Sequence, residues 1–237
     1  MFEETLKRYF DEAKLNLSED MSVKFSLYYK LIIEWNEKIN LTAITAEEEF
    51  IVKHLLDSLS VYFSGDMLNG DKKILDIGTG AGFPGIPLKI YSDSLNITLL
   101  DSLQKRVKFL NEVIERLKLK NITAIQGRAE DLARTELRES FDMAVSRAVA
   151  SLPVLLEYSL PFVKKDGYFI AWKGSKAKEE AEEARNALKI LGGKIEDIRE
   201  VIIPKLNEER FLITIKKEGT IPSKYPRRAG TPTKKPL

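Results

Sequence analysis

The sequence has no cysteine and a single histidine, and each scarcity excludes a class of site. Without cysteine there is neither a disulfide nor a thiolate metal ligand, and one histidine cannot build a histidine-rich metal centre. No apolar run is long enough to span a bilayer, and residues 1–7 lack the basic-then-apolar layout of a signal peptide. We therefore expect a cytoplasmic protein with no metal centre and no membrane partner.

The residues that are present indicate a globular protein with an uneven distribution of charge. The 237 residues are 43% hydrophobic and 31% charged, which is enough apolar material for a buried core. The net charge is only +2, yet residues 216–237 hold seven basic residues against one acid. This concentration of positive charge predicts a polyanionic partner.

Three segments with different patterns follow one another along the chain. In residues 1–66 apolar side chains recur at steps of three and four, which predicts helices, one of them over residues 47–63. A turn-rich boundary at 66–73 leads into residues 67–217, where apolar strands alternate with amphipathic helices. Residues 218–237 contain four prolines, which predicts an extended arm rather than helix or strand.

The middle segment predicts an α/β fold with a mostly parallel sheet, because strands that alternate with helices are joined by long crossovers. The last two strands have a short connection, so we expect them to form an antiparallel hairpin. This is the Rossmann-like, seven-stranded layout of class I S-adenosylmethionine-dependent methyltransferases. One helix is expected over residues 177–191, with Gly192 as its cap. The predicted strands cover residues 73–77, 96–100, 121–125, 141–145, 168–172, 194–203 and 210–216.

A glycine-rich turn after the first predicted strand is the main candidate for a cofactor site. Residues 80–85 match the dinucleotide pattern G-x-G-x-x-G, whereas residues 76–82, with Gly78 and Gly80, match the D-x-G-x-G-x-G pattern of S-adenosylmethionine sites. Asp76 favours the second pattern, because its carboxylate repels a pyrophosphate but can orient the ammonium group of the methyl donor. The turn alone leaves a nicotinamide cofactor open.

Two further strand ends carry residues suited to the rest of the methyl donor. Asp101 ends the second strand, 19 residues beyond Gly82, near the spacing at which an acid meets ribose hydroxyls. Ala129 and Glu130 follow the third strand, at the place where this fold normally contacts the adenine. An ordinary loop with a helix-capping acid is the alternative there.

The acceptor atom is narrowed by what the fourth strand end lacks. Methylation at a base carbon uses a cysteine, and methylation of exocyclic amines uses an Asn/Asp-Pro-Pro-aromatic stretch, whose place residues 146–151 occupy here. A guanine N7 carries no proton, so the enzyme has only to position it. No acid–base catalyst is assigned. Arg147 is a candidate for the donor carboxylate or an acceptor phosphate, with a surface salt bridge as the equal alternative, and Lys173 is a candidate for RNA phosphate. These two residues are the candidates for positioning the reactants, and His54 is interpreted as a core or capping residue.

The basic arm has the composition of an RNA-binding segment. Its cations can neutralise phosphates, its tyrosine and arginine planes can stack on bases, and its prolines lower the entropy lost on docking. A solubilising tail is the alternative. On the first interpretation, removing the arm abolishes RNA methylation and leaves cofactor binding nearly intact. The RNA-binding candidates are Lys173, Tyr225, Arg227, Arg228, Lys234 and Lys235.

Several motifs taken together resemble the RsmG family, also called GidB, of bacterial 16S rRNA guanine-N7 methyltransferases. The motifs at the two ends of the chain are more specific to this family than the glycine turn, which many methyltransferases share. The motifs are WNEKINLT at 35–42, HLLDSL at 54–59, DIGTGAGFPG at 76–85, DS at 101–102, GRAE at 127–130, SRA at 146–148 and YPRRAGTP at 225–232.

The resemblance implies transfer of a methyl group from S-adenosylmethionine to N7 of a guanine in the 530 loop of 16S rRNA, free or in the 30S subunit, by a monomer. Three other functions are weighed against it: a small-molecule methyltransferase, a nicotinamide-dependent oxidoreductase and a binding module without catalysis. The basic arm argues against the first, because a small substrate needs no phosphate-binding segment. The residues that the resemblance places at the donor are Gly78, Phe83, Asp101, Ala129, Glu130 and Arg147, and Ser102, next to Asp101, is added to the candidates.

Overall fold

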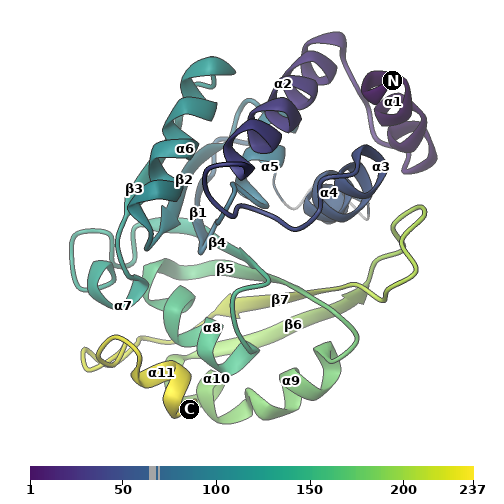
Figure 1. Ribbon diagram of the computed structural model, residues 1–237. Helices are drawn as coiled ribbons and strands as arrows, with labels where there is room; N and C mark the ends of the chain where they lie inside the picture. Colours follow the sequence, from purple (N-terminus) through teal and green to yellow (C-terminus); the bar gives the residue numbers. More distant parts are fainter. Residues whose placement is uncertain (64–67, 69) are drawn as a thin grey trace.

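A seven-stranded sheet runs through the centre of the computed structural model, which describes residues 1–63, 68 and 70–237 (Figure 1). The strand order is β3-β2-β1-β4-β5-β7-β6; the first five strands are parallel and β7 runs antiparallel to both neighbours. The predicted sheet with its terminal hairpin is therefore confirmed. The strands are β1 (Lys73–Ile77), β2 (Asn96–Asp101), β3 (Ile122–Gln126), β4 (Phe141–Arg147), β5 (Val163–Lys173), β6 (Gly193–Glu200) and β7 (Phe211–Lys217).

The chain reverses its strand order at β1, which lies between β2 and β4. In parallel sheets the loops that leave the carboxyl ends of such strands diverge to opposite sides, and a crevice opens between them. Four of the five β1 residues are buried, which suits a strand covered on both faces. The glycine turn leaves the sheet at this point, so the predicted cofactor motif stands at the topological switch point.

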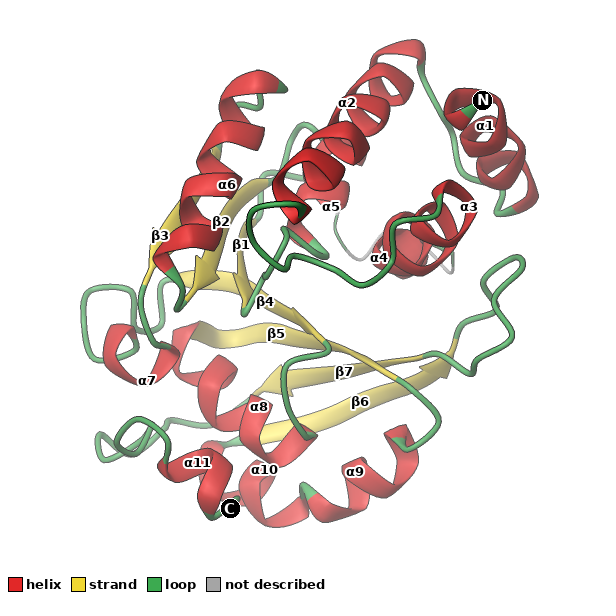
Figure 2. Cartoon of the chain, in the orientation of Figure 1, coloured by secondary structure: helices red, strands yellow, loops and turns green. Residues whose placement is uncertain are grey.

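The N-terminal helices pack on one face of the sheet, together with α5 (Gly85–Tyr91) and α6 (Gln104–Arg116) (Figure 2). The helices predicted before the sheet are confirmed as α1 (Phe2–Glu12), α2 (Glu19–Asn36) and an unbroken helical run from residue 47 to 62. The predicted boundary at 66–73 includes residues that lie outside the described part of the chain. The run consists of α3 (Glu47–Phe50), the π-helix η1 (Ile51–Leu56), α4 (Asp57–Leu59) and the 3-10 turn η2 (Ser60–Tyr62).

The opposite face of the sheet is covered by shorter helices and by the end of the chain (Figure 1). The prediction of a single helix over residues 177–191 is wrong. The ψ angle of Ala184 is −3°, which departs from the α-helical value and separates α9 from α10. Gly192 caps α10 in the left-handed conformation, with φ of +66°, as predicted. The elements are α7 (Ala129–Leu132), α8 (Leu152–Ser159), η3 (Leu160–Phe162), α9 (Ala177–Glu183) and α10 (Arg185–Leu191).

The prediction of an extended C-terminal arm is wrong, since the segment folds back onto the body of the protein. Tyr225 is only 7% exposed, and the guanidinium of Arg138 donates to the carbonyl oxygens of Ile221 and Tyr225 at 3.1 and 2.9 Å. The segment ends in a short helix, α11 (Thr231–Lys234). Pro232 is tolerated there because the first turn of a helix does not use its N–H groups.

None of the helices in the described ranges combines the length and the hydrophobicity that crossing a membrane requires.

Candidate active site

The turn after β1 requires glycine at its first position. Gly78 has φ of +69°, in the left-handed region that favours glycine, and a Cβ atom there would lie 2.6 Å from Cγ2 of Val149. The amide nitrogens of Gly78 and Thr79 donate to the Leu100 carbonyl oxygen at 2.9 and 3.1 Å, which ties the turn to the end of β2. The backbone thus stays close to both neighbouring strand ends and presents its surface to the crevice.

Asp76 lies fully buried beneath this turn. Its Oδ2 accepts hydrogen bonds from the Thr79 hydroxyl at 2.6 Å and from the Gly85 amide at 2.8 Å. Burial raises the pKa of this carboxyl to about 7, although the two hydrogen bonds oppose the rise. Its Oδ1 has no hydrogen-bond partner among the described residues, which is the feature an ammonium group or a bridging water satisfies. The contact of Asp76 with the donor ammonium stays a prediction. Its two hydrogen bonds show that Asp76 holds the glycine turn in place.

A cavity of about 340 Å³ opens beside the turn, between the ends of β1, β2 and β3, and we refer to it as the donor cavity because residues predicted to bind the methyl donor line it. Asp101 at its wall is 3% exposed and accepts from the amides of Gly80 and Leu103 at 3.0 and 2.8 Å and from Arg106 at 3.3 Å. The structure therefore brings together five of the predicted cofactor residues at one wall. These five are Gly78, Asp101, Ser102, Ala129 and Glu130.

The donor cavity fits S-adenosylmethionine better than a dinucleotide. Two carboxyl groups that are almost fully buried, those of Asp101 and Glu130, face a ligand that can donate hydrogen bonds, such as a ribose or an adenine amine. A pyrophosphate would instead meet the carboxylates of Asp101 and Glu130, and like charges repel strongly where solvent is scarce. The cavity also has an apolar edge, because Val149 lines it and is 40% exposed.

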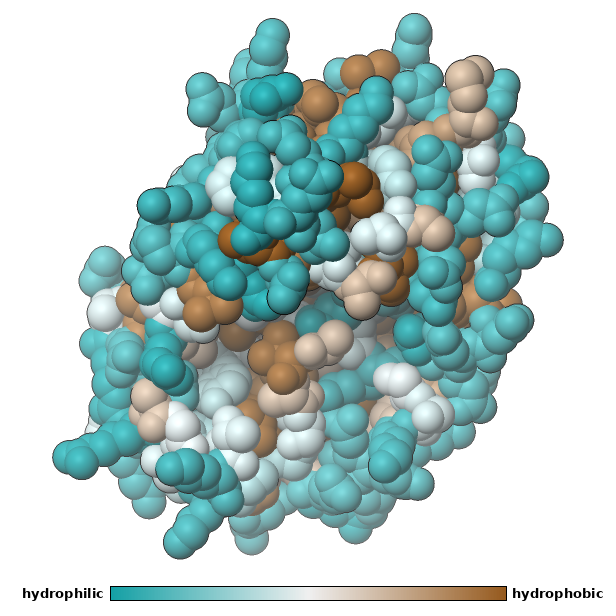
Figure 3. Space-filling model, in the orientation of Figure 1, coloured by the Kyte–Doolittle hydropathy of each residue, from teal (hydrophilic) through white to brown (hydrophobic). Residues whose placement is uncertain are grey.

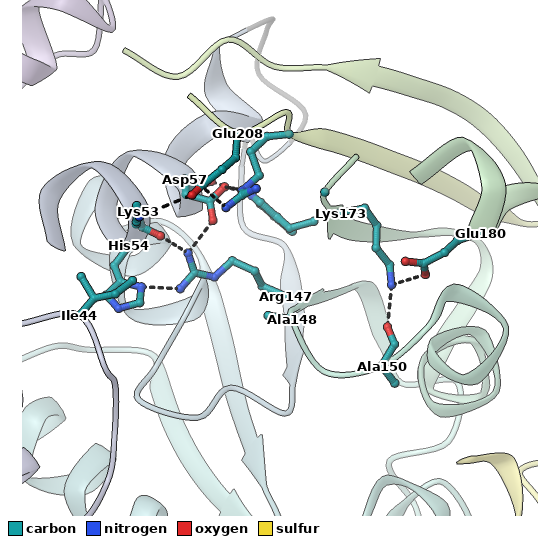
Figure 4. A pocket seen from close by; sticks show the side chains of 13 residues that line it. Ile44, Lys53, His54, Asp57, Arg147, Ala148, Ala150, Lys173, Glu180 and Glu208 are labelled. Atoms are coloured by element: carbon teal, nitrogen blue, oxygen red, sulfur yellow. Dashed lines mark hydrogen bonds and ion pairs between the residues drawn. The ribbon is translucent and has the colours of Figure 1, made fainter. Parts of the chain in front are cut away.

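A second cavity, of about 550 Å³, lies at the carboxyl ends of β4 and β5, against the N-terminal helices (Figure 4). Four cations and three acids line it, and they come from the N-terminal helices, from β4 and β5, from α9 and from the loop before β7. Ala148, directly after β4, lines both cavities and has φ of +55°, a conformation that costs energy for a residue with a Cβ atom. The charged residues are Lys53, Asp57, Arg147, Lys173, Glu180, Glu208 and Arg210.

Arg147 belongs to the second cavity and does not line the donor cavity. Its guanidinium donates to Oδ2 of Asp57 at 2.7 Å and to the Lys53 carbonyl oxygen at 2.9 Å, and it lies 4.8 Å from the centre of the Phe83 ring. Asp57 is 4% exposed, and Arg210 approaches its other oxygen at 3.5 Å. The helix that begins near residue 47 is thereby joined to two strand ends of the sheet.

His54 is held as a neutral ring in this cluster. Burial lowers the pKa of its imidazole to about 3, and the positive charge of Arg147 adds to the effect. Because an arginine can only donate, Nδ1 of His54 accepts from Arg147 at 3.1 Å, and the proton on Nε2 faces the Thr42 hydroxyl at 2.8 Å. The ring stacks on Phe83 at 4.3 Å between ring centroids. His54 is therefore a packed, hydrogen-bonded residue, in line with its interpretation from the sequence.

Lys173 at the end of β5 is already paired within the protein. It is 7% exposed, and its Nζ donates to the Ala150 carbonyl oxygen at 2.6 Å and to Glu180 at 2.7 Å (Figure 4). Its predicted contact with an RNA phosphate stays a prediction. The indole of Trp172, the residue before it, donates to the Asp57 carbonyl oxygen at 2.8 Å. This hydrogen bond ties the end of β5 to the N-terminal helices that form the opposite wall of the second cavity.

The remaining predicted residues divide between structural and exposed positions. Asp76, Gly80 and Phe83 line neither cavity. Tyr225 is buried, and Arg227 forms an ion pair at 2.6 Å with Glu157, which has 0% exposure. Of the residues predicted to bind RNA, those with exposed side chains are Arg228, Lys234 and Lys235.

The sequence prediction missed part of the donor cavity. Tyr158 lines it from α8, more than 20 residues beyond the third strand end, and no local pattern connects it with the cofactor motif. Arg106 also lines it, and its position on the first turn of α6, after Asp101, is a signal that could have been used.

Figure 3 shows a mostly hydrophilic surface, with hydrophobic residues gathered near the middle of the face.

Known proteins resemble this chain along nearly its whole length. The family model described as "rRNA small subunit methyltransferase G" matches residues 21–213. A protein of Lachnoclostridium phytofermentans with the name ribosomal RNA small subunit methyltransferase G is 54% identical over 94% of this chain and 92% of its own length. The protein of the same name from Desulforamulus reducens is 50% identical over 98% of this chain and 97% of its own.

Solved structures resemble the fold at much lower identity. A SAM-dependent methyltransferase of Aquifex aeolicus has a TM-score of 0.53 and 20% identity, covering 69% of this chain and 90% of its own. The [4+2]-cyclase SpnF has a TM-score of 0.57 and 13% identity, covering 84% of this chain and 96% of its own. A cyclase and a methyltransferase thus share the fold, so the fold alone does not decide the reaction. The family match does: methyltransferase activity and the prediction of S-adenosylmethionine as cofactor are confirmed, and the chain belongs to the rRNA small subunit methyltransferase G family.

Proposed function

We propose that this chain transfers a methyl group from S-adenosylmethionine to N7 of a guanine in the 530 loop of 16S rRNA. The observation that supports it most is the meeting of two cavities at Ala148, which lines both. One cavity has the acids and the close backbone that suit the methyl donor, and the other has the cations that suit a nucleic acid. A methyl group carried at the shared wall can be reached from the acceptor side.

The donor is held by the residues that line the smaller cavity. The backbone at Gly78 approaches it closely, Asp101 accepts from the ribose hydroxyls, and Ala129 and Glu130 contact the adenine. When bound, S-adenosylmethionine supplies an electrophilic methyl group on a sulfonium. The chain contributes by fixing the orientation of this group toward Ala148 and the second cavity.

The acceptor guanine enters the larger cavity, and the cations there meet the RNA backbone. Lys53, Arg147, Lys173 and Arg210 supply positive charge, and phosphate binding is the commonest use of such a cluster beside a nucleic acid. Guanine N7 has a free lone pair and no proton to lose, so the residues have only to align it and exclude water. The acids of the same cavity offset the positive charge that the methylated ring acquires.

We further propose that the enzyme acts as a monomer in the cytoplasm, where ribosomal subunits are assembled, and that its reaction needs no metal. Among the described residues there is no group of three or more acids and histidines placed to hold a metal ion. In this proposal the N-terminal helices form one wall of the second cavity, the sheet and the loops that follow its strands bind the donor, and residues 218–237 support the donor side. Exposed Arg228, Lys234 and Lys235 remain available to RNA.

The direct test is methyl transfer with mapping of the product. The protein is incubated with labelled S-adenosylmethionine and either 30S subunits or naked 16S rRNA, and the RNA is then reduced and cleaved with aniline, which cuts at N7-methylguanosine. We expect one cleavage in the 530 loop, with an Asp101→Ala variant as the control that lacks ribose binding. Label on another base or another atom, or no label on either RNA, contradicts the proposal.

A further inference from the structure

The C-terminal segment, residues 221–237, is anchored by a buried ion pair. Glu157 on α8 is fully buried, and Arg227 donates to it from its backbone amide at 2.7 Å, from Nε at 2.9 Å and from Nη2 at 2.6 Å. Such a charge-assisted, forked contact fixes both the position and the direction of the arginine. Residues 229–237 therefore leave from a fixed point on the surface of the protein.

Beyond this anchor the segment reaches two residues that line the donor cavity. The Gly230 amide donates to Oε1 of Glu130 at 2.9 Å, and the Thr233 hydroxyl lies 3.0 Å from the Tyr158 hydroxyl. Glu130 and Tyr158 both belong to the wall of that cavity. Each contact connects residues at least 75 positions apart, so two wall residues of the donor cavity are held from behind by the last residues of the chain.

The Gly230 amide restrains the carboxyl group of Glu130, which also interacts with the Tyr158 hydroxyl. Glu130 is 4% exposed and belongs to α7, a helix of four residues. Without Gly230, its carboxylate would lose a hydrogen bond in a place where water reaches it poorly, and its side chain would be free to turn. Tyr158 loses its contact with the Thr233 hydroxyl in the same event and keeps its interaction with Glu130, because Thr233 lies three residues beyond Gly230.

We propose that residues 229–237 are a positioning element of the methyl-donor site, which holds Glu130 and Tyr158 in the orientation that binds the adenine end of the donor. This inference rests on the proposed function, since it takes S-adenosylmethionine as the ligand of the cavity. It replaces the expectation that removal of the C-terminal arm leaves cofactor binding nearly intact. The exposed charges of Lys234 and Lys235 serve RNA binding independently of this role.

A chain that ends at Arg228 separates the two roles. It keeps buried Tyr225 and the ion pair of Arg227 with Glu157, so the fold is retained, but it lacks Gly230 and Thr233. Calorimetry with S-adenosylhomocysteine should give a Kd about tenfold higher than that of the full chain, the effect of about two lost hydrogen bonds. The matched control is the double variant Lys234→Ala/Lys235→Ala, which removes the charges and keeps the contacts, and whose Kd should not change.

A point variant tests the hydroxyl contact alone. Thr233→Val keeps the shape and removes the hydroxyl, and it should raise the same Kd about threefold, whereas Thr233→Ser should restore it. Thermal unfolding of each variant without ligand reports its fold. Equal Kd values for the full and the shortened chain, with the full chain binding normally, overturn this inference alone. No binding by the full chain overturns the proposed function, and this inference with it.

Discussion

The two cavities that meet at Ala148 are built in different ways. The donor cavity is formed mostly by residues that directly follow β1, β2, β3 and β4, and backbone amides make several of its contacts. The second cavity is formed by long charged side chains from segments far apart in the sequence, such as Lys53, Arg147 and Arg210. The sheet fixes the shape of a cavity that strand ends form. The shape of a cavity that ion pairs form depends on the presence of both charged residues in each pair.

This difference predicts how each cavity responds to change. Replacing a backbone-dependent residue of the donor cavity should mainly alter ligand affinity, because the sheet persists. Replacing one partner in the second cavity should also reduce stability, because the remaining buried charge lacks compensation.

The largest effect is expected for Arg147→Met. Asp57 would keep only the longer contact with Arg210, at 3.5 Å, and would stay buried with part of its charge uncompensated. The free energy of unfolding in urea should fall by about 3 kcal/mol. The double variant Arg147→Met/Asp57→Asn should recover part of this loss. A single variant within 1 kcal/mol of the natural protein would show that the ion pair is not what holds the second cavity together.

The next effect is expected for Gly78→Ala in the donor cavity. The new Cβ atom meets Val149 at 2.6 Å, and φ of +69° is unfavourable for alanine, so the turn must move away from the ligand. The Kd of S-adenosylhomocysteine should rise about thirtyfold, or about 2 kcal/mol, with a smaller change in stability. Adding Val149→Ala relieves the contact but not the torsion, and should recover only part of the affinity. A Kd within threefold of the natural value speaks against the close approach of the backbone.

The sequence predicted the donor cavity better than the second one, for the same structural reason. Strands and their ends follow from apolar runs and from the glycine turn, so Gly78, Asp101 and Ala129 could be placed together before the structure was known. The pairing of Arg147 with Asp57 joins residues 90 positions apart, and no local pattern encodes it.

The C-terminal segment shows a second limit of sequence reasoning. Its prolines predicted an extended arm, because proline excludes regular structure in general, but the segment docks through carbonyl oxygens that arginine side chains satisfy. The composition of the segment predicted its positive charge correctly, but the prediction that it extends away from the body of the protein was wrong. The partner of Arg227 is buried Glu157 on α8, a contact that depends on how the whole chain folds.

A pH-dependent effect of intermediate size is expected for His54→Gln. In the unfolded chain the imidazole binds a proton below about pH 6.5, but in the folded protein its pKa is about 3, so the natural protein loses stability as pH falls. The variant lacks this loss. Its deficit in unfolding free energy should therefore be about 1.4 kcal/mol smaller at pH 5.5 than at pH 7.5. Asp76, whose raised pKa of about 7 gives the opposite dependence, is present in both proteins. An equal deficit at both pH values would mean that His54 is not held neutral.

The smallest effect is expected for Lys173→Met, because Glu180 is partly exposed and keeps the hydrogen bond from the Leu152 amide at 2.6 Å when the cation is lost. The KM for RNA should rise about threefold at moderate salt, with no change in the Kd of S-adenosylhomocysteine. Lys120→Ala, a change of an exposed cation that lines neither cavity and lies outside the C-terminal segment, is the comparison. If the two variants change the RNA affinity alike and neither responds to salt, the positive charge of the second cavity does not contact phosphate.

The proposed acceptor atom is guanine N7, which the second cavity presents to the methyl donor. The direct measurement uses 30S subunits reconstituted with 16S rRNA that carries 7-deazaguanosine, with carbon in place of N7, at the methylated position. We predict no transfer of labelled methyl to this RNA and full transfer to the same particle with guanosine. Undiminished transfer to the 7-deaza particle would contradict the account, because the methyl group would then have another acceptor.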